Sequence, residues 1–210
     1  MEILQEISAS LQKGEAKKVE ELILQALDEG ISAKQILEEG LLAGMSVIGD
    51  KFKNNEVFVP EVMFAASAMN AGSTILKPHL SESDISSVGK VVLGTVKGDM
   101  HDVGKNLVRM MMEGKGLEVI DVGVDVSAEK FIETAKAENA QVIACSALLT
   151  TTMGEMKAVV DAATAAGIRD KVTIMIGGAP VTAAFCEIIG ADIYSPDAAG
   201  AAIEAAKACQ

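Results

Sequence analysis

The sequence predicts an α/β protein in two parts, an N-terminal bundle of four helices followed by a doubly wound parallel sheet of five strands. Over residues 1–76 the apolar residues recur every three or four positions, as in amphipathic helices, and strand-like alternation is absent. Beyond residue 90 there are five short β-branched runs, each followed by a segment of helical length. Strands that are apolar throughout are buried on both faces, as in a parallel sheet covered by helices.

Four amphipathic segments with short connections make up the predicted bundle. Ser32 and Gln35 fit a capping box that opens the third helix, and Gly30 suits the end of the second. Pro60 suits the first turn of the fourth helix. The first three helices are expected to include residues 3–11, 19–27 and 36–48.

The bundle and the sheet are joined by a polar segment. Residues 77–90, KPHLSESDISSVGK, contain no periodic apolar pattern and indicate an interdomain linker. We therefore expect a helical domain over residues 1–80, a linker over 81–90 and an α/β domain over 91–210. The predicted strands are residues 91–96, 117–123, 142–147, 171–178 and 191–195. Ligands of doubly wound sheets bind beyond the carboxyl ends of the strands, so functional residues should lie in the loops that follow them.

Composition excludes several classes of function. A formal net charge of -12 argues against nucleic-acid binding, which needs basic residues to neutralise phosphates. It also disfavours anionic membrane surfaces, and the apolar runs are too short to span a bilayer. The N-terminus lacks the pattern of a secretory signal, so we expect a cytoplasmic protein. The three cysteines are far apart and without CxxC spacing, which supports neither disulfides nor a zinc site.

One of the two histidines, His101, follows the first predicted strand in the segment GTVKGDMHDVGKNLV. A neutral imidazole offers one nitrogen to a metal while the other donates to a carboxylate, for which Asp99 is a candidate. The alternative is a purely structural loop, in which Gly98 and Gly104 shape a turn and Asp99 or Asp102 caps the next helix. No second His or Cys stands nearby to complete a protein-only site. A macrocyclic cofactor would require only one axial donor from the protein.

Three motifs in register identify a family resemblance. DMHDVG, residues 99–104, matches the Asp-x-His-x-x-Gly motif of cobalamin-binding proteins, and SALLTTTM and GGAPVT match their later loops. With the four helices in front, nearly all 210 residues resemble the methyl-carrying corrinoid proteins of methylotrophic methanogens and acetogens. The cobalamin-binding module of methionine synthase is similar too. The resemblance implies a helical cap, a Rossmann-like domain and cobalamin as cofactor.

The resemblance also implies residue roles. His101 would replace the cofactor's own dimethylbenzimidazole as the lower axial ligand of cobalt, and Asp99 would hold the histidine and relay a proton. Thr152 stands where methionine synthase has a serine that completes this relay, and its additional methyl group is a departure. The remaining positions implied to contact the cofactor or its tail are Gly98, Met100, Asp102, Gly104, Ser146, Leu148, Thr150, Gly177 and Gly178. Without the resemblance, the two adjacent glycines would indicate an ordinary loop.

In the helical part the resemblance implies that Phe52 and Phe58 cover the upper face of the corrin. The alternative is that these residues, like Met45, Val59 and Met63, belong to the core of the bundle, as most Met and Phe residues at helical spacing do. A cover of this kind must move aside for each transfer, which would give the linker a mechanical purpose.

By resemblance, the chain carries a methyl group on cobalt as one component of a multi-protein system. Its partners would be a substrate-specific methyltransferase, a second methyltransferase serving an acceptor such as tetrahydrofolate or a thiol, and a reductive activator. Three alternatives stay open: a cobalamin-dependent sensor, the small subunit of an adenosylcobalamin-dependent mutase, and an α/β domain without a corrinoid. The sequence shows no output segment for a sensor, and the helical half argues against a mutase subunit. It does not select among methanol, methylamines, methoxylated aromatics and betaines as methyl donor.

Overall fold

The computed structural model describes residues 2–80 and 88–210, which form two compact units, one of N-terminal helices and one of a sheet with its helices. Most of the predicted linker, residues 81–87, lies outside the described residues. Within the two described ranges no helix is both long and apolar enough to cross a membrane.

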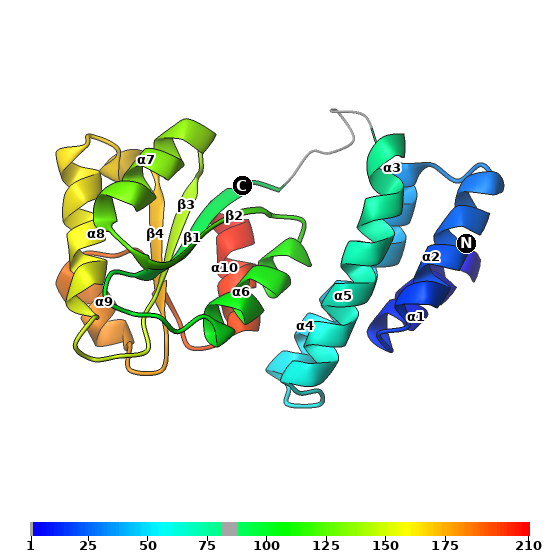
Figure 1. Ribbon diagram of the computed structural model, residues 1–210, viewed down its shortest axis with the longest axis horizontal. Coiled ribbons are helices and arrows are strands. Elements are labelled where there is room, and N and C mark those ends of the chain that lie inside the picture. Colours follow the sequence, from blue (N-terminus) through cyan, green and yellow to red (C-terminus); the bar gives the residue numbers. More distant parts are fainter. Residues whose placement is uncertain (1, 81–87) are drawn as a thin grey trace. The chain divides into compact units, whose positions relative to one another are not determined.

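The helical unit contains the four predicted helices (Figure 1). The third is one continuous helix in three stretches, of which the middle one, η1, is π-helical. A short 3₁₀ turn, η2, follows the last helix and contains His79. The elements are α1 (Glu2–Gln12), α2 (Ala16–Asp28), α3 (Ala33–Gln35), η1 (Ile36–Leu42), α4 (Ala43–Lys53), α5 (Val59–Leu76) and η2 (Lys77–His79).

The apolar stripe of each helix forms the core of this unit, as the periodicity predicts. Ile7, Leu11, Ile23 and Met45 are among its buried side chains. Small residues let the helices approach closely. A Cβ at Gly72 of α5 would lie 2.6 Å from Ile23 Cδ1 of α2, so a larger residue there would force that side chain to shift.

Two details of the third helix differ from the prediction. The Ser32 hydroxyl accepts the Gln35 backbone N–H at 3.2 Å, which is half of the expected capping box. The second hydrogen bond of a capping box, from the Ser32 backbone N–H to the Gln35 side chain, was wrongly predicted, because the Gln35 side chain donates to Glu39 instead, at 3.1 Å. The π-helical stretch η1 was not predicted.

The second unit is an all-parallel sheet in the order β2-β1-β3-β4-β5, which confirms the predicted α/β fold. Figure 1 shows α7, α8 and α9 on one face and α6 and α10 on the other. The strands are β1 (Lys90–Val96), β2 (Glu118–Val126), β3 (Val142–Ser146), β4 (Thr173–Gly177) and β5 (Ile193–Ser195). The helices are α6 (Val103–Glu113), α7 (Ala128–Glu138), α8 (Gly154–Ala165), α9 (Ala183–Ile189) and α10 (Ala198–Ala208), with a 3₁₀ turn, η3 (Arg169–Lys171), before β4.

This strand order places the carboxyl ends of β1 and β3 side by side. Leu93 pairs with Ala144 and Thr95 with Ser146, so the loops after the two strands begin at the same level of the sheet. From β1 the chain continues to β2 on one side, and from β3 it continues to β4 on the other side. The gap between the ends of β1 and β3 is therefore the topological switch point, where doubly wound sheets bind ligands. The prediction that β2 ends at Gly123 was wrong, because the strand continues to Val126.

Gly94 in the middle of β1 provides a test of this packing. A Cβ there would lie 2.6 Å from Val122 Cγ2 and 2.8 Å from Phe131 Cζ, so Gly94→Ala overpacks the core and should destabilise the sheet unit by about 2 kcal/mol. Gly154→Ala is the matched control: no atom lies within 4 Å of the added carbon, and it should be neutral or stabilising by about 0.5 kcal/mol. Urea unfolding followed by fluorescence of Tyr194, the single tyrosine in a chain without tryptophan, reports on this unit. Equal stability of the two variants would contradict the packing described.

Candidate functional site

The loops after β1 and β3 bring the predicted ligand histidine and its carboxylate together with the SALLTTTM segment. Asp99 and His101 lie between β1 and α6, and Leu148 to Thr152 lie between β3 and α8. The site is therefore formed at the switch point, by segments about 50 residues apart in the sequence.

Asp99 is the centre of the site. Its side chain is 0% exposed, and its two oxygens accept five hydrogen bonds. Oδ1 accepts the backbone N–H of His101 at 3.1 Å and faces His101 Nδ1 at 2.7 Å. Oδ2 accepts the backbone N–H groups of Leu148 at 2.8 Å and Leu149 at 3.1 Å, and it lies 3.0 Å from the Thr152 hydroxyl. Asp99 thus joins both loops and does not cap a helix.

These donors keep the buried carboxylate charged. Burial alone would raise the pKa of Asp99, but hydrogen bonds from the His101 side chain and from the backbone N–H groups of Leu148, His101 and Leu149 outweigh it and hold the pKa well below its usual range. Asp99 is therefore ionised at neutral pH and acts only as an acceptor.

An ionised Asp99 determines the tautomer of His101. Because the carboxylate can only accept, Nδ1 of His101 carries a proton, and in the neutral imidazole the lone pair is then on Nε2. The side chain is 51% exposed, so that lone pair is accessible from outside the sheet unit. The Thr95 hydroxyl donates to the His101 carbonyl at 2.8 Å and fixes the backbone as well. The arrangement offers one oriented nitrogen donor, which is what a metal held in a macrocycle needs from a protein.

Thr152 is buried behind Asp99. Its hydroxyl oxygen lies 3.0 Å from Asp99 Oδ2 and 2.9 Å from the Leu149 carbonyl, and its single proton can be donated to either. Its methyl carbon lies beside Gly98, 3.4 Å from where a Cβ would stand at that position. His101, Asp99 and Thr152 form a continuous hydrogen-bonded chain from the surface to the interior.

Exposed apolar side chains surround the histidine. Met100 is 68% and Val103 is 73% exposed on the first loop and the start of α6, and Leu148 and Leu149 are exposed on the second loop. Apolar groups gathered in this way on the surface are typical of a site where a ligand or a partner binds.

The four predicted glycines of the site differ in backbone angle and in the space that a side chain would have. Gly178 has φ +132°, and a Cβ there would lie 1.9 Å from the Ala147 carbonyl oxygen, so only glycine fits where the β4 loop passes the β3 loop. Gly98 has φ +80° in the turn before Asp99. A Cβ at Gly177 would come within 3.2 Å of the Ser195 carbonyl oxygen. Gly104, in the first turn of α6, has no atom within 4 Å of such a carbon, which leaves room beside the helix.

The other predicted residues are in less constrained places. Asp102 is exposed and accepts the Asn106 side-chain amide at 3.2 Å. Ser146 is the half-buried last residue of β3, and Thr150 is exposed in the following loop.

The two phenylalanines belong to the helical unit. Phe52 is half-buried on α4, and Phe58 is exposed before α5. Met45 is a core residue, whereas Met63 is 50% exposed.

Three contributors were missed by the sequence analysis. Thr95 and Asp125 hold the histidine loop through hydrogen bonds to its backbone, and Leu149 donates its N–H to Asp99. Thr95 and Leu149 lie inside segments already singled out, but backbone donors and acceptors are common to all residues and give no sequence signal. Asp125 lies in the part of β2 that was not predicted.

The cysteines take no part in this chemistry. All three are free, and burial raises the pKa of the Cys145 thiol to about 12, so it stays protonated and unreactive at neutral pH.

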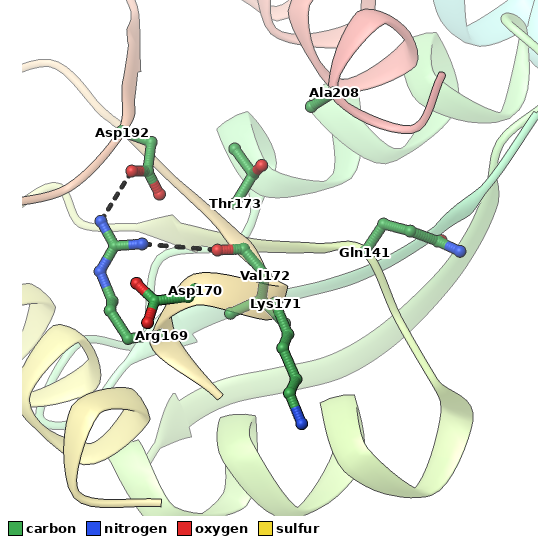
Figure 2. Close-up of a pocket in the computed structure, with 8 residues that line it drawn as sticks. All are labelled: Gln141, Arg169, Asp170, Lys171, Val172, Thr173, Asp192 and Ala208. Atoms are coloured by element: carbon green, nitrogen blue, oxygen red, sulfur yellow. Dashed lines mark hydrogen bonds and ion pairs between the residues drawn. The ribbon is translucent and has the colours of Figure 1, made fainter. Parts of the chain in front are cut away.

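A separate hollow of about 610 Å³ lies at the opposite, amino-terminal edge of the sheet (Figure 2). The Arg169 guanidinium donates there to Asp192 at 2.7 Å and to the Gly190 carbonyl at 2.7 Å, and Asp192 also accepts the Ile174 N–H at 2.7 Å. These contacts fasten the starts of β4 and β5 and leave the pair neutral. The lining residues are Gln141, Arg169, Asp170, Lys171, Val172, Thr173, Asp192 and Ala208.

Comparisons with known proteins agree with this geometry. Two family models, each described as a B12 binding domain, match residues 89–206 and residues 3–77. The chain is 42% identical to a dimethylamine corrinoid protein of Methanosarcina barkeri, over 97% of this chain and 96% of that protein. It is 42% identical to trimethylamine corrinoid protein 1 of Methanosarcina acetivorans, over 85% of this chain and 83% of that protein.

Solved structures show the same likeness. A crystal structure of the methanol:cobalamin methyltransferase complex of Methanosarcina barkeri matches with a TM-score of 0.89 and 30% identity, over 96% of this chain and 77% of that chain. A cobalamin-binding protein of Desulfitobacterium hafniense matches with a TM-score of 0.79 and 30% identity, over 98% of both chains.

Removal of the Asp99 carboxylate should destabilise the sheet unit even without a cofactor. Asp99→Ala leaves the Leu148 and Leu149 N–H groups and the Thr152 hydroxyl without this acceptor, and we expect a loss of about 3 kcal/mol in urea unfolding at pH 7. The exposed neighbour provides the control, since Asp102→Asn should change stability by less than about 0.5 kcal/mol.

The contribution of Asp99 should also depend on pH in a defined direction. Because its pKa is lower in the folded than in the unfolded chain, its stabilisation is fully present at neutral pH and is lost as the pH falls below about 4. The stability difference between wild type and Asp99→Asn should therefore shrink between pH 6 and pH 3, roughly the interval in which an unfolded Asp becomes protonated. A difference that stays constant or grows on acidification would contradict the charged, hydrogen-bonded state described here.

Proposed function

Because the chain belongs to the corrinoid proteins of methyltransferase systems, with B12 binding domains and cobalamin as cofactor, we propose that it carries a methyl group on cobalt between two methyltransferases. The first takes the methyl group from a donor, and the second delivers it to an acceptor such as tetrahydrofolate or a thiol. The observation that carries the proposal is the half-exposed His101, whose Nε2 is left free by the Nδ1 contact with Asp99.

The residues present fit a corrinoid. His101 provides a single nitrogen donor, and Met100, Val103, Leu148 and Leu149 provide an exposed apolar surface beside it. A flat macrocycle with a metal at its centre matches both features, because it needs one axial ligand and buries apolar area.

Cobalamin supplies a cobalt centre that accepts and gives up methyl groups, a chemistry that no amino-acid side chain offers. The protein contributes the ligand and its orientation. His101 Nε2 would hold the metal, and Asp99 would keep the imidazole in place through its contact with Nδ1. Nδ1 of His101 and Oδ1 of Asp99 are placed to hold or share a proton, and the Thr152 hydroxyl can donate to Asp99 Oδ2 or turn to the Leu149 carbonyl.

The other assignments belong to the same proposal. Ser146, Thr150, Gly177 and Gly178 would line the path of the nucleotide tail. Gly98, Asp102 and Gly104 would shape the loop next to it. Phe52 and Phe58 would cover the upper face of the corrin, and residues 81–90 would link a cap domain over 1–80 to the cofactor domain over 91–210.

The relatives suggest which partner to test first. Those named for dimethylamine and trimethylamine are 42% identical to the chain, whereas the chain in the methanol complex is 30% identical. We therefore propose a methylamine-specific methyltransferase as the donor-side partner, with the acceptor-side methyltransferase and a reductive activator as further partners. Donor specificity itself would reside in the partner enzyme.

The ligand assignment is tested by electron paramagnetic resonance of the cob(II)alamin-loaded protein. With nitrogen-15-labelled protein and unlabelled cofactor, wild type should show superhyperfine splitting from one nitrogen-15 nucleus, which the cofactor's own base cannot give, and His101→Ala should lose it because no other imidazole lies in this loop. His79→Ala, which changes the exposed second histidine on η2, is the matched control and should leave the spectrum unchanged. A nitrogen-15 splitting that survives in His101→Ala would overturn the assignment.

Thr152 is tested with two variants of similar size. Thr152→Ser keeps the hydroxyl, whereas Thr152→Val replaces it with a methyl group and removes the donor to Asp99. With the methylamine-specific methyltransferase and methylamine as donor, we expect Thr152→Ser to transfer methyl groups at a rate near that of wild type. Thr152→Val should be slower by about tenfold, the effect of losing one charge-assisted hydrogen bond. Equal rates for both variants would remove Thr152 from the relay.

A further inference from the structure

Strand β2 is irregular where it reaches the histidine loop. Leu93 and Gly94 are consecutive on β1, but their partners on β2 are Asp121 and Gly123. The next pair on β1, Gly94 and Val96, has Gly123 and Val126 as partners. Strand β2 thus contains two extra residues relative to β1. Such bulges redirect the backbone and are frequent next to functional sites.

Each bulge contains a residue in the left-handed region. Gly123 has φ 91°, which glycine adopts freely, and its N–H donates to Asp121 Oδ1 at 2.9 Å. The other oxygen of Asp121 pairs with the buried Lys105 of α6, which fastens the start of the irregular segment. Asp125 has φ 54°, a conformation that is unfavourable for a residue with a side chain and persists only where surrounding contacts maintain it.

The contacts that maintain Asp125 are made with the histidine loop. Its N–H donates to the Asp99 carbonyl at 3.0 Å, and its Oδ1 accepts the Gly98 N–H at 2.7 Å. The Asp99 side chain is held by the loop after β3, and the His101 carbonyl by Thr95. Asp125 supplies the hydrogen bonds that hold Gly98 and Asp99 by their backbone from the β2 side.

We propose that Asp125 is a positioning residue that fixes the position of the Asp99–His101 pair. It does so through two hydrogen bonds, one to the Asp99 carbonyl and one from the Gly98 N–H, which hold this backbone at the bulged end of β2 and which we call the clasp. The inference rests on the proposed function, in which that pair provides the ligand of cobalt. The left-handed backbone at Asp125 aims its N–H and its carboxyl oxygen at the same turn, so the role requires a side-chain acceptor as well as the bulge.

A purely conformational role predicts a different result. If position 125 needed only a left-handed residue, glycine would serve at least as well as aspartate, because it removes the backbone strain. If the clasp matters, Asp125→Gly loosens the loop although it relieves strain, and Asp125→Asn preserves the loop. Asparagine tolerates the same backbone and keeps an acceptor oxygen.

The first test uses the cofactor-free protein and backbone amide hydrogen exchange measured by NMR. We expect the Gly98 amide to exchange about tenfold faster in Asp125→Gly than in wild type, the effect of losing one hydrogen bond, and at the wild-type rate in Asp125→Asn. Asn139→Gly is the matched control, because Asn139 also has φ 54° but lies at the end of α7. An unchanged Gly98 rate in Asp125→Gly, or the same acceleration in Asn139→Gly, would refute the clasp.

The second test uses the cob(II)alamin-loaded proteins. In nitrogen-15-labelled protein, the fraction of cobalt with nitrogen-15 superhyperfine splitting should fall in Asp125→Gly and stay at the wild-type level in Asp125→Asn and Asn139→Gly. An undiminished fraction in Asp125→Gly would overturn the positioning role. If wild type itself lacks the splitting, the proposed function fails and the exchange rates alone decide whether the clasp exists.

Discussion

The buried charge of Asp99 is the constraint on which the rest of the site depends. A carboxylate removed from water is stable only if donors replace its hydration, and here both oxygens are surrounded by donors from two loops. That requirement orders the loop after β3, whose backbone N–H groups turn toward Asp99. It also orders the imidazole on the outer side. The charge of Asp99 thereby orders the loops after β1 and β3 and places a proton on Nδ1 of His101.

The strand order makes such an arrangement possible. With β1 and β3 adjacent and their connections running to opposite faces, the two loops diverge above the sheet and leave their first residues close together. Donors from the β3 loop can reach a carboxylate in the β1 loop without a long side chain, because backbone N–H groups suffice. The loop after β4 is also packed against the loop after β3, because Gly178 lies directly beside the Ala147 carbonyl.

The chemical result is a histidine with one defined free nitrogen, held from several directions. Asp99 holds the ring, Thr95 holds the carbonyl of His101, and Asp125 holds the turn before it. In the proposed role as a metal ligand, such a fixed orientation would keep the nitrogen aligned with the metal. The strained backbone of Asp125 fits the general pattern in which unfavourable conformations persist at functional sites, maintained by surrounding contacts.

The sequence by itself determined the two units, the five strands with their helices and the Asp99–His101 pair. Periodicity follows from burial, and the short Asp-x-His spacing marked Asp99 as a candidate partner of the imidazole. The family resemblance added Thr152. Only the tertiary structure decided that Leu148 and Leu149 donate their backbone N–H groups to Asp99, that β2 continues through two bulges, and that Asp125 clasps Gly98. These are contacts between distant segments made largely by the backbone, and because every residue type except proline offers the same N–H and carbonyl groups, no pattern of side chains encodes them.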